Sequence, residues 1–567
     1  MEKLHSDIES VRILTELLVQ KEIHDIVLSP GSRNAPLLVS VAKEKKLRHF
    51  VIPDERSAAF FALGIAQQSQ RTVALICTSG TALLNYAPAI AEAYYQGIPL
   101  LVISADRPPE WIDQDDSQTI RQNNILTPFV KYSCQLPVNI VTPEDRWYAN
   151  RLINEAINAS QTAYKGPVHV NIPLREPLYG FHSHGISPQR IIRVSPTRAE
   201  LLPDEKAKLQ GLFSRYNRIL LIVGFHTPDK IITQQIEQLI LQHKVVVLTE
   251  NIANKNIPQA IPTIDRVLAT IQYEEESLFA PDLLITFGGA VVSRMIKTFI
   301  RHHPPREHWH IDLREIAPDT YQSLTLPIKM EARAFFTQLT SGLAEKPEPS
   351  DYFRLWKEKE NLAEKRHNEY LSRIPWCDLK AFSLLLPALP ANTRLQLGNS
   401  TPVRYAQLFH CNTIARADGN RGTSGIDGCS STAVGASVTT RDPTILITGD
   451  IGFLYDSNAL WIKYKSSNLK IVVIQNGGGG IFRFLPGPSV LDEVEEFFET
   501  PHQVDIVRLG ELHGFKVFEA DNEITLKECI SSFFQPAEKP YLLVVKTPRT
   551  VNGNILKEYF KHLSKRN

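Results

Sequence analysis

The chain is 567 residues long, which is enough for three or four globular domains of roughly 150 residues each. Its 62 lysines and arginines against 61 aspartates and glutamates leave a net charge of +1, so it lacks the basic excess of proteins that coat nucleic acids. A hydrophobic content of 43% with 22% charged residues is ordinary for globular proteins and argues against a largely disordered chain.

The sequence shows no pattern typical of a secretory signal, a membrane span or a disulfide framework. The first residues, MEKLHSDIES, show no cationic stretch followed by an apolar core, which argues against a secretory signal. No run of about 18 apolar residues occurs, so we expect no membrane span. The six cysteines are scattered without a CxxC pair, which is typical of reduced thiols. We therefore expect a soluble cytoplasmic protein that binds no nucleic acid.

The first third of the chain alternates helices with short apolar strands. Apolar spacing predicts a helix over Ser6–Gln20, and apolar runs predict four strands: Asp25–Leu28, Thr72–Cys77, Ile98–Ser104 and Pro167–Ile172. Strand, turn and helix repeated in this way indicate a parallel sheet covered by helices on both faces.

Two further units of the same type follow. The predicted strands of the second are Arg218–Gly224, Lys244–Glu250, Asp282–Gly288 and His308–Leu313, and those of the third are Arg394–Leu397, Thr444–Thr448, Lys470–Gln475 and Tyr541–Lys546. A segment without periodicity near 181–200 and the charged stretch AEKPEPSDYF mark the boundaries. The fold class is therefore α/β, with three doubly wound parallel-sheet domains at 1–183, 184–348 and 349–567.

The strongest local signal lies in the third unit. One apolar strand ends at Gly449-Asp450, and the next ends at Asn476, ahead of a four-glycine run. The carboxyl ends of parallel strands share one edge of the sheet, where ligands of open α/β sheets bind. Carboxylate, amide and backbone oxygens suit Mg²⁺, and glycines allow backbone to approach a diphosphate. The alternative is that Asp450 only caps a helix and the glycines form a flexible loop.

A second signal is Glu55, which follows a short strand in VIPDERSAAFFALGIAQ and opens a helix of small and apolar residues. The alternative interpretation is an exposed first-turn glutamate that the helix dipole stabilises.

A third signal is cationic. Five arginines lie beside glycine turns or strand ends: Arg33, Arg107, Arg121, Arg404 and Arg421. Each alone is usually a solvated surface residue, but five together suggest a substrate with several carboxylates.

These segments resemble a known family. Gly-Asp followed after 25 intervening residues by Asn is similar to the diphosphate-binding motif of thiamine diphosphate (ThDP) enzymes, and Glu55 resembles their cofactor glutamate. Within that superfamily, further segments resemble the enzymes of menaquinone (vitamin K2) biosynthesis. These segments are SPGSRNAPL, DERSAAFFALGIA, SADRPPE with SQTIRQ, GNSTPVR, NRGTSGIDG and GGGGIFRFLP. The resemblance implies a pyrimidine-binding domain at 1–183, a central Rossmann-like domain without a nucleotide motif at 184–348, and a diphosphate-binding domain at 349–567.

The resemblance also implies roles for individual residues. Glu55 would contact the aminopyrimidine ring of ThDP and promote its imino tautomer. The metal, Mg²⁺ or Mn²⁺, would be bound by Asp450, Asn476 and the Gly478 carbonyl. The remaining cofactor-binding residues would be Gly449, Ile426, Ile481 and Phe482. The substrate-binding residues would be Ser32, Arg33, Arg107, Ser117, Gln118, Arg294, Ser400, Arg404, Arg421 and Phe482, and of these Ser32, Arg33, Gln118, Arg404 and Arg421 would join Glu55 in catalysis.

The implied activity is decarboxylation of 2-oxoglutarate and conjugate addition of the succinyl fragment to isochorismate. Both substrates carry two carboxylates, in agreement with the arginines. The implied assembly is a homodimer or homotetramer with active sites at the subunit interface. Two alternatives stay open: another ThDP-dependent decarboxylase or carboligase of the acetolactate synthase type, and a catalytically inactive binding protein on the same fold.

Four positions depart from the family pattern. Ile451 stands where the motif has a second glycine, and Gln475 replaces its first asparagine. Ser293 stands where the family has a lysine before the arginine that corresponds to Arg294, and Ser117 replaces an asparagine before Gln118.

Two weaker signals have simpler explanations. His308 and His310 should face the same way and pack in the protein instead of binding a metal, because no third ligand is near. The GFHTPD turn lacks GxGxxG, so no flavin is predicted.

Overall fold

The computed structural model describes residues 5–162, 164–182, 187–243, 245–344, 350–411, 413–485 and 487–566. The chain divides into two compact units: unit 1 is Met1–Pro196, Asn420–Arg441 and Leu454–Leu469, and unit 2 is Thr197–Gly419, Asp442–Phe453 and Lys470–Asn567. The predicted domain boundaries, 183/184 and 348/349, lie outside the described residues. None of the described helices has the length and hydropathy of a membrane span.

Unit 1 is built on a six-stranded parallel sheet. In spatial order its strands are β3 (Arg48–Val51), β2 (Asp25–Leu28), β4 (Val73–Cys77), β5 (Leu100–Asp106), β7 (Val168–Pro173) and β6 (Ser133–Gln135). Its helices are α1 (Glu9–Gln20), α2 (Ala35–Lys43), α3 (Glu55–Ser69), α4 (Thr81–Gln96), α5 (Pro143–Gln161) and α15 (Cys429–Ser437). Every residue of β4 and β5 is buried, as expected for strands covered on both faces.

Unit 2 contains two sheets. The five-stranded one runs β10 (Val246–Leu248), β9 (Ile219–Val223), β11 (Leu283–Phe287), β12 (Glu307–Asp312), β13 (Leu326–Lys329). The six-stranded one runs β15 (Arg416–Gly419), β14 (Arg394–Leu397), β16 (Thr444–Gly449), β17 (Leu469–Gln475), β19 (Tyr541–Lys546), β18 (Lys516–Ala520).

The α-helices of unit 2 that enter the argument below are α6 (Pro203–Arg215), α7 (Lys230–His243), α8 (Ile264–Leu268), α10 (Met295–His302), α11 (Ala332–Thr340), α12 (Asp351–Leu371), α13 (Asp378–Leu385), α14 (Thr401–Ala406) and α19 (Asn552–Leu563). Helix α16 (Asp450–Tyr455) follows β16 directly. The other α-helices of unit 2 are α9 (Glu276–Phe279), α17 (Ile506–Leu512) and α18 (Glu523–Phe533).

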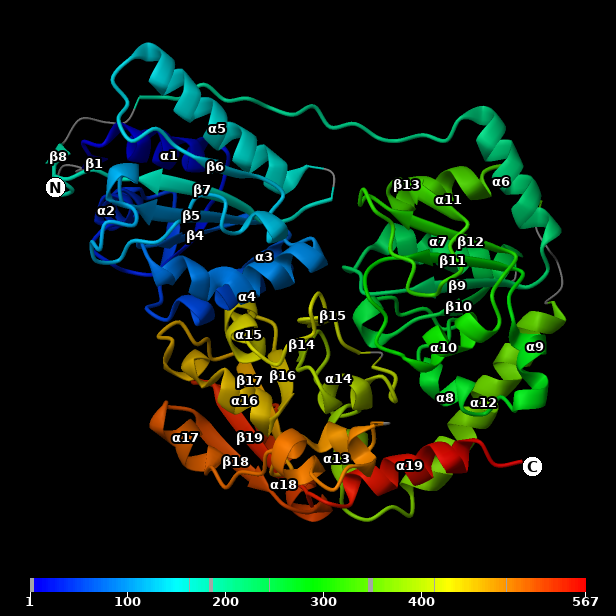
Figure 1. Cartoon of the computed structure of the whole chain (residues 1–567). Helices are drawn as coiled ribbons and strands as arrows, with labels where there is room; N and C mark the ends of the chain where they lie inside the picture. Colours follow the sequence, from blue (N-terminus) through cyan, green and yellow to red (C-terminus); the bar gives the residue numbers. More distant parts are fainter. Residues whose placement is uncertain are drawn as a thin grey trace. The chain divides into compact units, whose positions relative to one another are not determined.

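The period-two alternation of strands decides which helices cover each face of the five-stranded sheet. In β9, Leu221 and Val223 pack in one hydrophobic cluster with α6, α7 and α11. Leu220 and Ile222 point the other way and pack in a second cluster with α8, α10 and α12. Figure 1 shows these two helix layers on either side of the sheet. Since both faces are apolar, every residue of β9 is buried.

Helices α3 and α15 cross so closely that glycine is needed at the contact. A Cβ added at Gly64 of α3 would lie 2.1 Å from the Thr432 carbonyl oxygen, and one at Gly435 of α15 would lie 2.0 Å from the Phe61 carbonyl oxygen. The two helices therefore pack backbone against backbone. This contact matters for the site, because α3 begins at Glu55.

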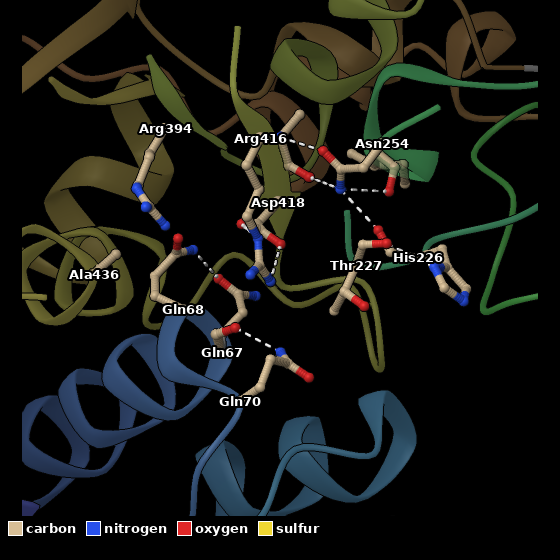
Figure 2. A network of polar contacts seen from close by, with 12 residues as sticks. Gln67, Gln68, Gln70, His226, Thr227, Asn254, Arg394, Arg416, Asp418 and Ala436 are labelled. Carbon is tan, nitrogen blue, oxygen red and sulfur yellow. Dashed lines mark hydrogen bonds and ion pairs between the residues drawn. The ribbon is translucent and has the colours of Figure 1, made fainter. Parts of the chain in front are cut away.

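Side-chain amides join the two sheets of unit 2. The Asn254 side chain pairs with both backbone groups of Ala417 in edge strand β15: Ala417 N–H donates to Oδ1 (2.7 Å), and Nδ2 donates to the Ala417 carbonyl (2.8 Å). Nδ2 also donates to the His226 carbonyl (2.8 Å). Figure 2 shows this pairing beside the buried, two-pronged ion pair of Arg416 with Asp418. The amide thus covers an edge that would otherwise present unpaired backbone groups.

The predicted strands agree with the observed ones to within a few residues. Those over 25–28, 394–397 and 541–546 coincide with β2, β14 and β19. The predicted helix over Ser6–Gln20 needs correction: α1 begins only at Glu9, because His5–Ser6 (β1) pairs with Phe181–His182 (β8). The strand predicted from Lys244 is shorter, with β10 at 246–248, and Lys244 itself lies outside the described residues.

His308 and His310 do face the same way. His308 Nε2 and His310 Nδ1 both contact the Thr286 hydroxyl, at 2.9 Å and 2.8 Å. Burial lowers the pKa of His308 to about 4, so this ring is neutral and acts as a packed, hydrogen-bonded group.

Replacing Gly435 with alanine should lower the stability of the folded protein. The new Cβ forces α3 and α15 apart, and overpacking of this kind costs about 1–3 kcal/mol. Gly211 in α6 is the matched control, because it is also a helical glycine but has open space around its Cβ position. Gly211→Ala should be neutral or stabilising by up to about 1 kcal/mol. Thermal unfolding compares the two variants, and equal melting temperatures would show that the crossing tolerates a methyl group.

Replacing Asp456 with asparagine should change how stability depends on pH. Asp456 accepts the Ser431 N–H (2.6 Å) and hydroxyl (2.8 Å), and burial raises its pKa to about 7. An unfolded aspartate titrates near pH 3.9, so between about pH 4 and 7 the folded state binds more protons and wild-type stability falls as pH rises. An asparagine at position 456 does not titrate. Its amide oxygen can accept the Ser431 N–H, and its amide nitrogen can donate to the Ser431 hydroxyl oxygen.

The stability of Asp456→Asn relative to wild type should therefore increase from pH 5 to pH 7, by at most about 1.4 kcal/mol per pH unit. Denaturant unfolding at several pH values measures this difference. A difference that stays constant across that range would show that Asp456 is already ionised in the folded protein at pH 5.

Candidate active site

The residues predicted for the site fall into the two units, and each group is described by itself. Unit 1 holds Ser32, Arg33, Glu55, Arg107, Ser117, Gln118, Arg421 and Ile426. Unit 2 holds Arg294, Ser400, Arg404, Gly449, Asp450, Asn476, Gly478, Ile481 and Phe482.

In unit 1, two of the predicted arginines meet at the carboxyl edge of the sheet. Arg33 is 5% exposed and donates to the Leu174 carbonyl (3.1 Å) and to Glu176 (3.0 Å). Arg107 lies 3.8 Å from the same Glu176 carboxylate and 3.1 Å from Asp116. Burial and the nearby Arg107 charge lower the pKa of Arg33. The pair can attract an anionic substrate group, which would compete with the largely exposed Glu176.

A buried polar network supports this edge from below. Asn171 Nδ2 donates to Asp106 (2.7 Å) and its Oδ1 accepts from the Ser104 hydroxyl (2.7 Å) and from Gln122 (3.0 Å). Burial raises the pKa of Asp106 to about 6. Gln122 in turn accepts the Gly80 N–H (2.8 Å), so the network also fixes the turn that starts α4.

Glu55 is the half-buried first residue of α3. Asp54 caps the helix by accepting the Ser57 N–H (2.7 Å). The Glu55 charge adds to burial in raising the pKa values of Tyr86 and of Cys77, the last residue of β4. Directly after that strand, the Thr78 and Ser79 hydroxyls are buried and have no hydrogen-bond partner within the described part of the chain. Buried polar groups in this condition suit a bound polar ligand.

The segment with Ser117 and Gln118 lies at the surface, and both residues are exposed. Gln118 has a left-handed backbone (φ 57°), and its Cα would lie 3.3 Å from a Cβ at Gly80. The Ser117 carbonyl accepts a hydrogen bond from Arg107 (3.3 Å), so the serine that departs from the family pattern contacts this arginine through its backbone. Ser32 is also exposed, whereas Arg121 is an exposed partner of Asp113 (2.7 Å).

Arg421 and Ile426 belong to a loop that a buried glutamate holds. Glu92 of α4 is 1% exposed and accepts the backbone N–H groups of Gly422 (2.6 Å) and Thr423 (2.7 Å). It also accepts the Thr423 hydroxyl (2.6 Å). Glu92 was not among the predicted site residues, because a lone glutamate in a helix gives no pattern that points to a loop 330 residues away.

In unit 2, Asp450 lies at the end of β16 and is 1% exposed. Its Oδ2 accepts the N–H groups of Gly477 (2.7 Å) and Gly478 (3.2 Å), and its Oδ1 accepts the Ile451 N–H (2.7 Å). Burial raises the pKa of Asp450 above its usual value, and the amides of Ile451 and Gly477 together with His502 offset part of that rise. His502, a residue that sequence reasoning missed, has Nε2 3.3 Å from Asp450 Oδ2.

Asn476 is 6% exposed, and its Nδ2 donates to the buried carboxylate of Asp378 (3.0 Å). Gln475 points elsewhere and donates to the Val504 carbonyl (3.3 Å), as expected for neighbouring residues of a strand. The replacement at position 475 therefore leaves the Asn476 contact in place. The Gly478 carbonyl accepts the Gly480 N–H (2.9 Å), which occupies one of its two lone pairs.

The glycine run leads into the short helix with Ile481 and Phe482. Ile481 is buried, and the Phe482 ring packs against Phe498 with centroids 5.5 Å apart. A Cβ at Gly478 would lie 2.7 Å from the Glu499 carbonyl oxygen, so this glycine is required for the segment 494–499 to approach. Among the described residues, no atom beyond the chain neighbours of Gly449 lies within 4 Å of a Cβ built there, which leaves room at the end of β16.

Arg294 and Arg404 line one cavity of about 600 Å³. Its walls are mainly apolar and include Met295, Phe484 and Leu556. Arg404 donates to the Ser400 carbonyl (2.5 Å), and Ser400 has a left-handed backbone (φ 73°) at the start of α14. Two acidic residues, Asp265 and Glu276, also line the cavity. A substrate with carboxylates would bind the two guanidinium groups and place its hydrocarbon part against the apolar wall.

Ser293, next to the cavity residue Arg294, makes hydrogen bonds that hold the segment before α10. Its backbone N–H and that of Val292 donate to the buried Glu250 (2.7 Å each). Its hydroxyl donates to Asp265 and accepts the Ile296 N–H (3.1 Å). Burial raises the pKa of Glu250 to about 7. Ser293 thus fixes the start of α10 next to Arg294, in a position where the family pattern has a lysine.

The donor set in unit 2 fits a hard cation. Asp450 supplies carboxylate oxygens, and Asn476 has an amide oxygen that is left over once its nitrogen binds Asp378. With the Gly478 carbonyl these are oxygen ligands of the kind that Mg²⁺ prefers, and the space at Gly449 admits phosphate oxygens. The buried hydroxyls of Thr78 and Ser79 in unit 1 fit the polar ring of a cofactor.

Comparisons with known proteins agree with this geometry. Residues 9–125 match the family model described as thiamine pyrophosphate enzyme, N-terminal TPP binding domain. Residues 399–545 match thiamine pyrophosphate enzyme, C-terminal TPP binding domain. These two matches cover the segments that hold the unit 1 arginines and the Asp450 cluster.

Curated relatives align over the whole chain. A protein of Porphyromonas gingivalis is 43% identical over 100% of this chain and 99% of its own length. One of Christiangramia forsetii is 41% identical (99% and 99%), and one of Bacteroides fragilis is 38% identical (99% and 100%). All three are named 2-succinyl-5-enolpyruvyl-6-hydroxy-3-cyclohexene-1-carboxylate synthase. Identity at this level along the full length leads to one conclusion: the chain belongs to the family of these synthases, within the thiamine diphosphate-dependent enzymes.

Proposed function

We propose that this protein decarboxylates 2-oxoglutarate with ThDP and Mg²⁺ (or Mn²⁺) and adds the resulting succinyl fragment to isochorismate. The product is 2-succinyl-5-enolpyruvyl-6-hydroxy-3-cyclohexene-1-carboxylate, an intermediate of menaquinone biosynthesis. The observation that carries this proposal is the full-length relationship to synthases named for that product. The cavity with Arg294 and Arg404 supports it, because both substrates are dicarboxylates with a hydrocarbon frame.

ThDP, when bound, supplies the stabilised carbanion chemistry that decarboxylation of a 2-oxo acid requires. Glu55 would hold and exchange a proton with the pyrimidine ring, for which its half-buried position at the start of α3 is suitable. Asp450, Asn476 and the Gly478 carbonyl would hold the cation, and Gly449 would leave room for the diphosphate. Ile426, Ile481 and Phe482 would enclose the cofactor and exclude water.

The arginines would bind and orient the two substrates. Arg33, Arg107 and Arg421 in unit 1, with Ser32, Ser117 and Gln118, would form one set of contacts. Arg294, Ser400 and Arg404 in unit 2 would form another. Guanidinium groups grip carboxylates in two-pronged geometry, so each set can fix the direction in which a substrate lies. We assign the protein to the cytoplasm as a homodimer or homotetramer whose active sites combine residues of two subunits.

A product assay tests the function. The full-length protein is incubated with 2-oxoglutarate and isochorismate, and ThDP and Mg²⁺ are omitted in turn. We expect product only in the complete mixture. Turnover of pyruvate in place of 2-oxoglutarate would favour an acetolactate synthase-like enzyme, and absence of cation-dependent ThDP binding would favour an inactive binding protein.

Replacing Arg404 with alanine should raise the KM for at least one substrate by about 10- to 100-fold, because a charge-assisted hydrogen bond contributes about 1.5–3 kcal/mol. The control is Arg508→Ala, which removes an arginine with an 85% exposed side chain. Steady-state kinetics with each substrate varied in turn provide the measurement. If KM for both substrates equals the wild-type value, Arg404 does not contact substrate.

Replacing Glu55 with glutamine should lower turnover by about 100-fold or more, because glutamine cannot exchange the proton. Asp450→Ala should be inactive for a different reason, the loss of cation binding. Glu144→Gln, another first-turn glutamate but exposed, is the control and should keep wild-type rates.

The two inactive variants, Glu55→Gln and Asp450→Ala, also test whether the active site combines residues of two subunits. If each site takes Glu55 from one subunit and Asp450 from another, mixed oligomers of the two inactive variants contain some intact sites. Co-refolding or co-expression should then restore a substantial part of the activity. Failure of mixed oligomers to regain activity would place both residues of a site in one chain.

A further inference from the structure

We propose that Asp378 is a positioning residue for the cation site, which orients the Asn476 side chain so that its oxygen faces the metal. The inference rests on the proposed function, because it presumes that Asn476 is a metal ligand. Asp378 touches neither substrate nor metal in this scheme. It acts through the side chain that does.

Both oxygens of Asp378 are committed to hydrogen bonds inside the protein. Asp378 is the first residue of α13 and is 1% exposed. Its Oδ2 accepts from Asn476 Nδ2 at 3.0 Å, and its Oδ1 accepts from the Thr547 hydroxyl at 2.6 Å. Its backbone N–H donates to Asn552 Oδ1 at 2.8 Å. The carboxylate is thus held by residues at the ends of β17 and β19, and the backbone of Asp378 is held by the start of α19.

This arrangement leaves Asn476 one favourable orientation. A carboxamide has an oxygen that only accepts hydrogen bonds and a nitrogen that only donates them, and an ionised carboxylate only accepts. The amide nitrogen must therefore face Asp378, and the amide oxygen points the opposite way. After a flip, the two oxygens would meet without a proton between them, inside a buried site.

The orientation matters because a hard cation binds oxygen and not an amide nitrogen. In the absence of Asp378, the Asn476 side chain would present nitrogen to the cation in part of the population. Outer groups that orient metal ligands in this way typically change metal affinity 10- to 100-fold. Asp450 needs no such partner, because its carboxylate presents an oxygen to the cation in either orientation.

A purely structural role for Asp378 is the competing explanation, and Thr547 separates the two. Thr547→Val removes the other hydrogen bond to the same buried carboxylate and leaves the Asn476 contact intact. Asp378→Ala removes both. The two variants therefore share a loss of buried hydrogen bonding but differ in whether Asn476 is oriented.

The experiment measures Mg²⁺ affinity at saturating ThDP in the full-length protein, by calorimetric titration, together with the melting temperature. Asp378→Ala should bind Mg²⁺ about 10- to 100-fold more weakly than wild type. Thr547→Val should stay within about threefold of wild type even if its melting temperature falls. Asp378→Asn should also remain close to wild type, because its oxygen can accept from Asn476 while its amide donates to the Thr547 hydroxyl.

Equal Mg²⁺ affinity in wild type and a folded Asp378→Ala would overturn the inference, and so would an equal loss in Thr547→Val. If Asp378→Ala does not fold, the double variant Asp378→Asn/Thr547→Val is compared with its single parents. The asparagine at 378 is then free to flip, so weaker Mg²⁺ binding than in either parent is expected, and unchanged binding contradicts the role. Absence of Mg²⁺-dependent ThDP binding in wild type would instead overturn the proposed function itself.

Discussion

Each carboxylate that this chain buries has to find hydrogen-bond donors, because a buried carboxyl group without them loses its hydration uncompensated. The backbone N–H groups of loops face the same requirement. The two needs are met together at Asp450, which takes the consecutive amides of Gly477 and Gly478. These hydrogen bonds fix the glycine run on which the proposed cation site depends.

The same arrangement recurs at two other loops. Glu92 takes the consecutive amides of Gly422 and Thr423, beside Arg421. Glu250 takes those of Val292 and Ser293, beside Arg294. In each case a buried acid of one element fixes a loop that carries a proposed substrate or metal contact. A loop held in this way keeps its functional side chain in place without needing a hydrophobic core of its own.

How well a strand can be predicted depends on where it lies in the sheet. Central strands such as β4, β9 and β17 are apolar along nearly their whole length because both faces are covered, and they were predicted closely. The edge strands β6, β13, β15 and β18 were missed. In β15 the sequence Arg416–Gly419 contains a buried ion pair, Arg416 with Asp418, and no apolar run. Such a strand is stabilised by partners that the local sequence does not contain, here the amide of Asn254.

The sequence by itself determined the fold class and the family, because apolar periodicity and short motifs are local properties. It could not identify Glu92, Asp378 or His502, since each is an ordinary acidic or imidazole side chain whose partner lies tens to hundreds of residues away. The tertiary structure also decided what the departures mean: Gln475 points away from Asp378, and Ser293 binds Asp265. Hydrogen bonding depends on distance in space, and only the folded chain sets that distance.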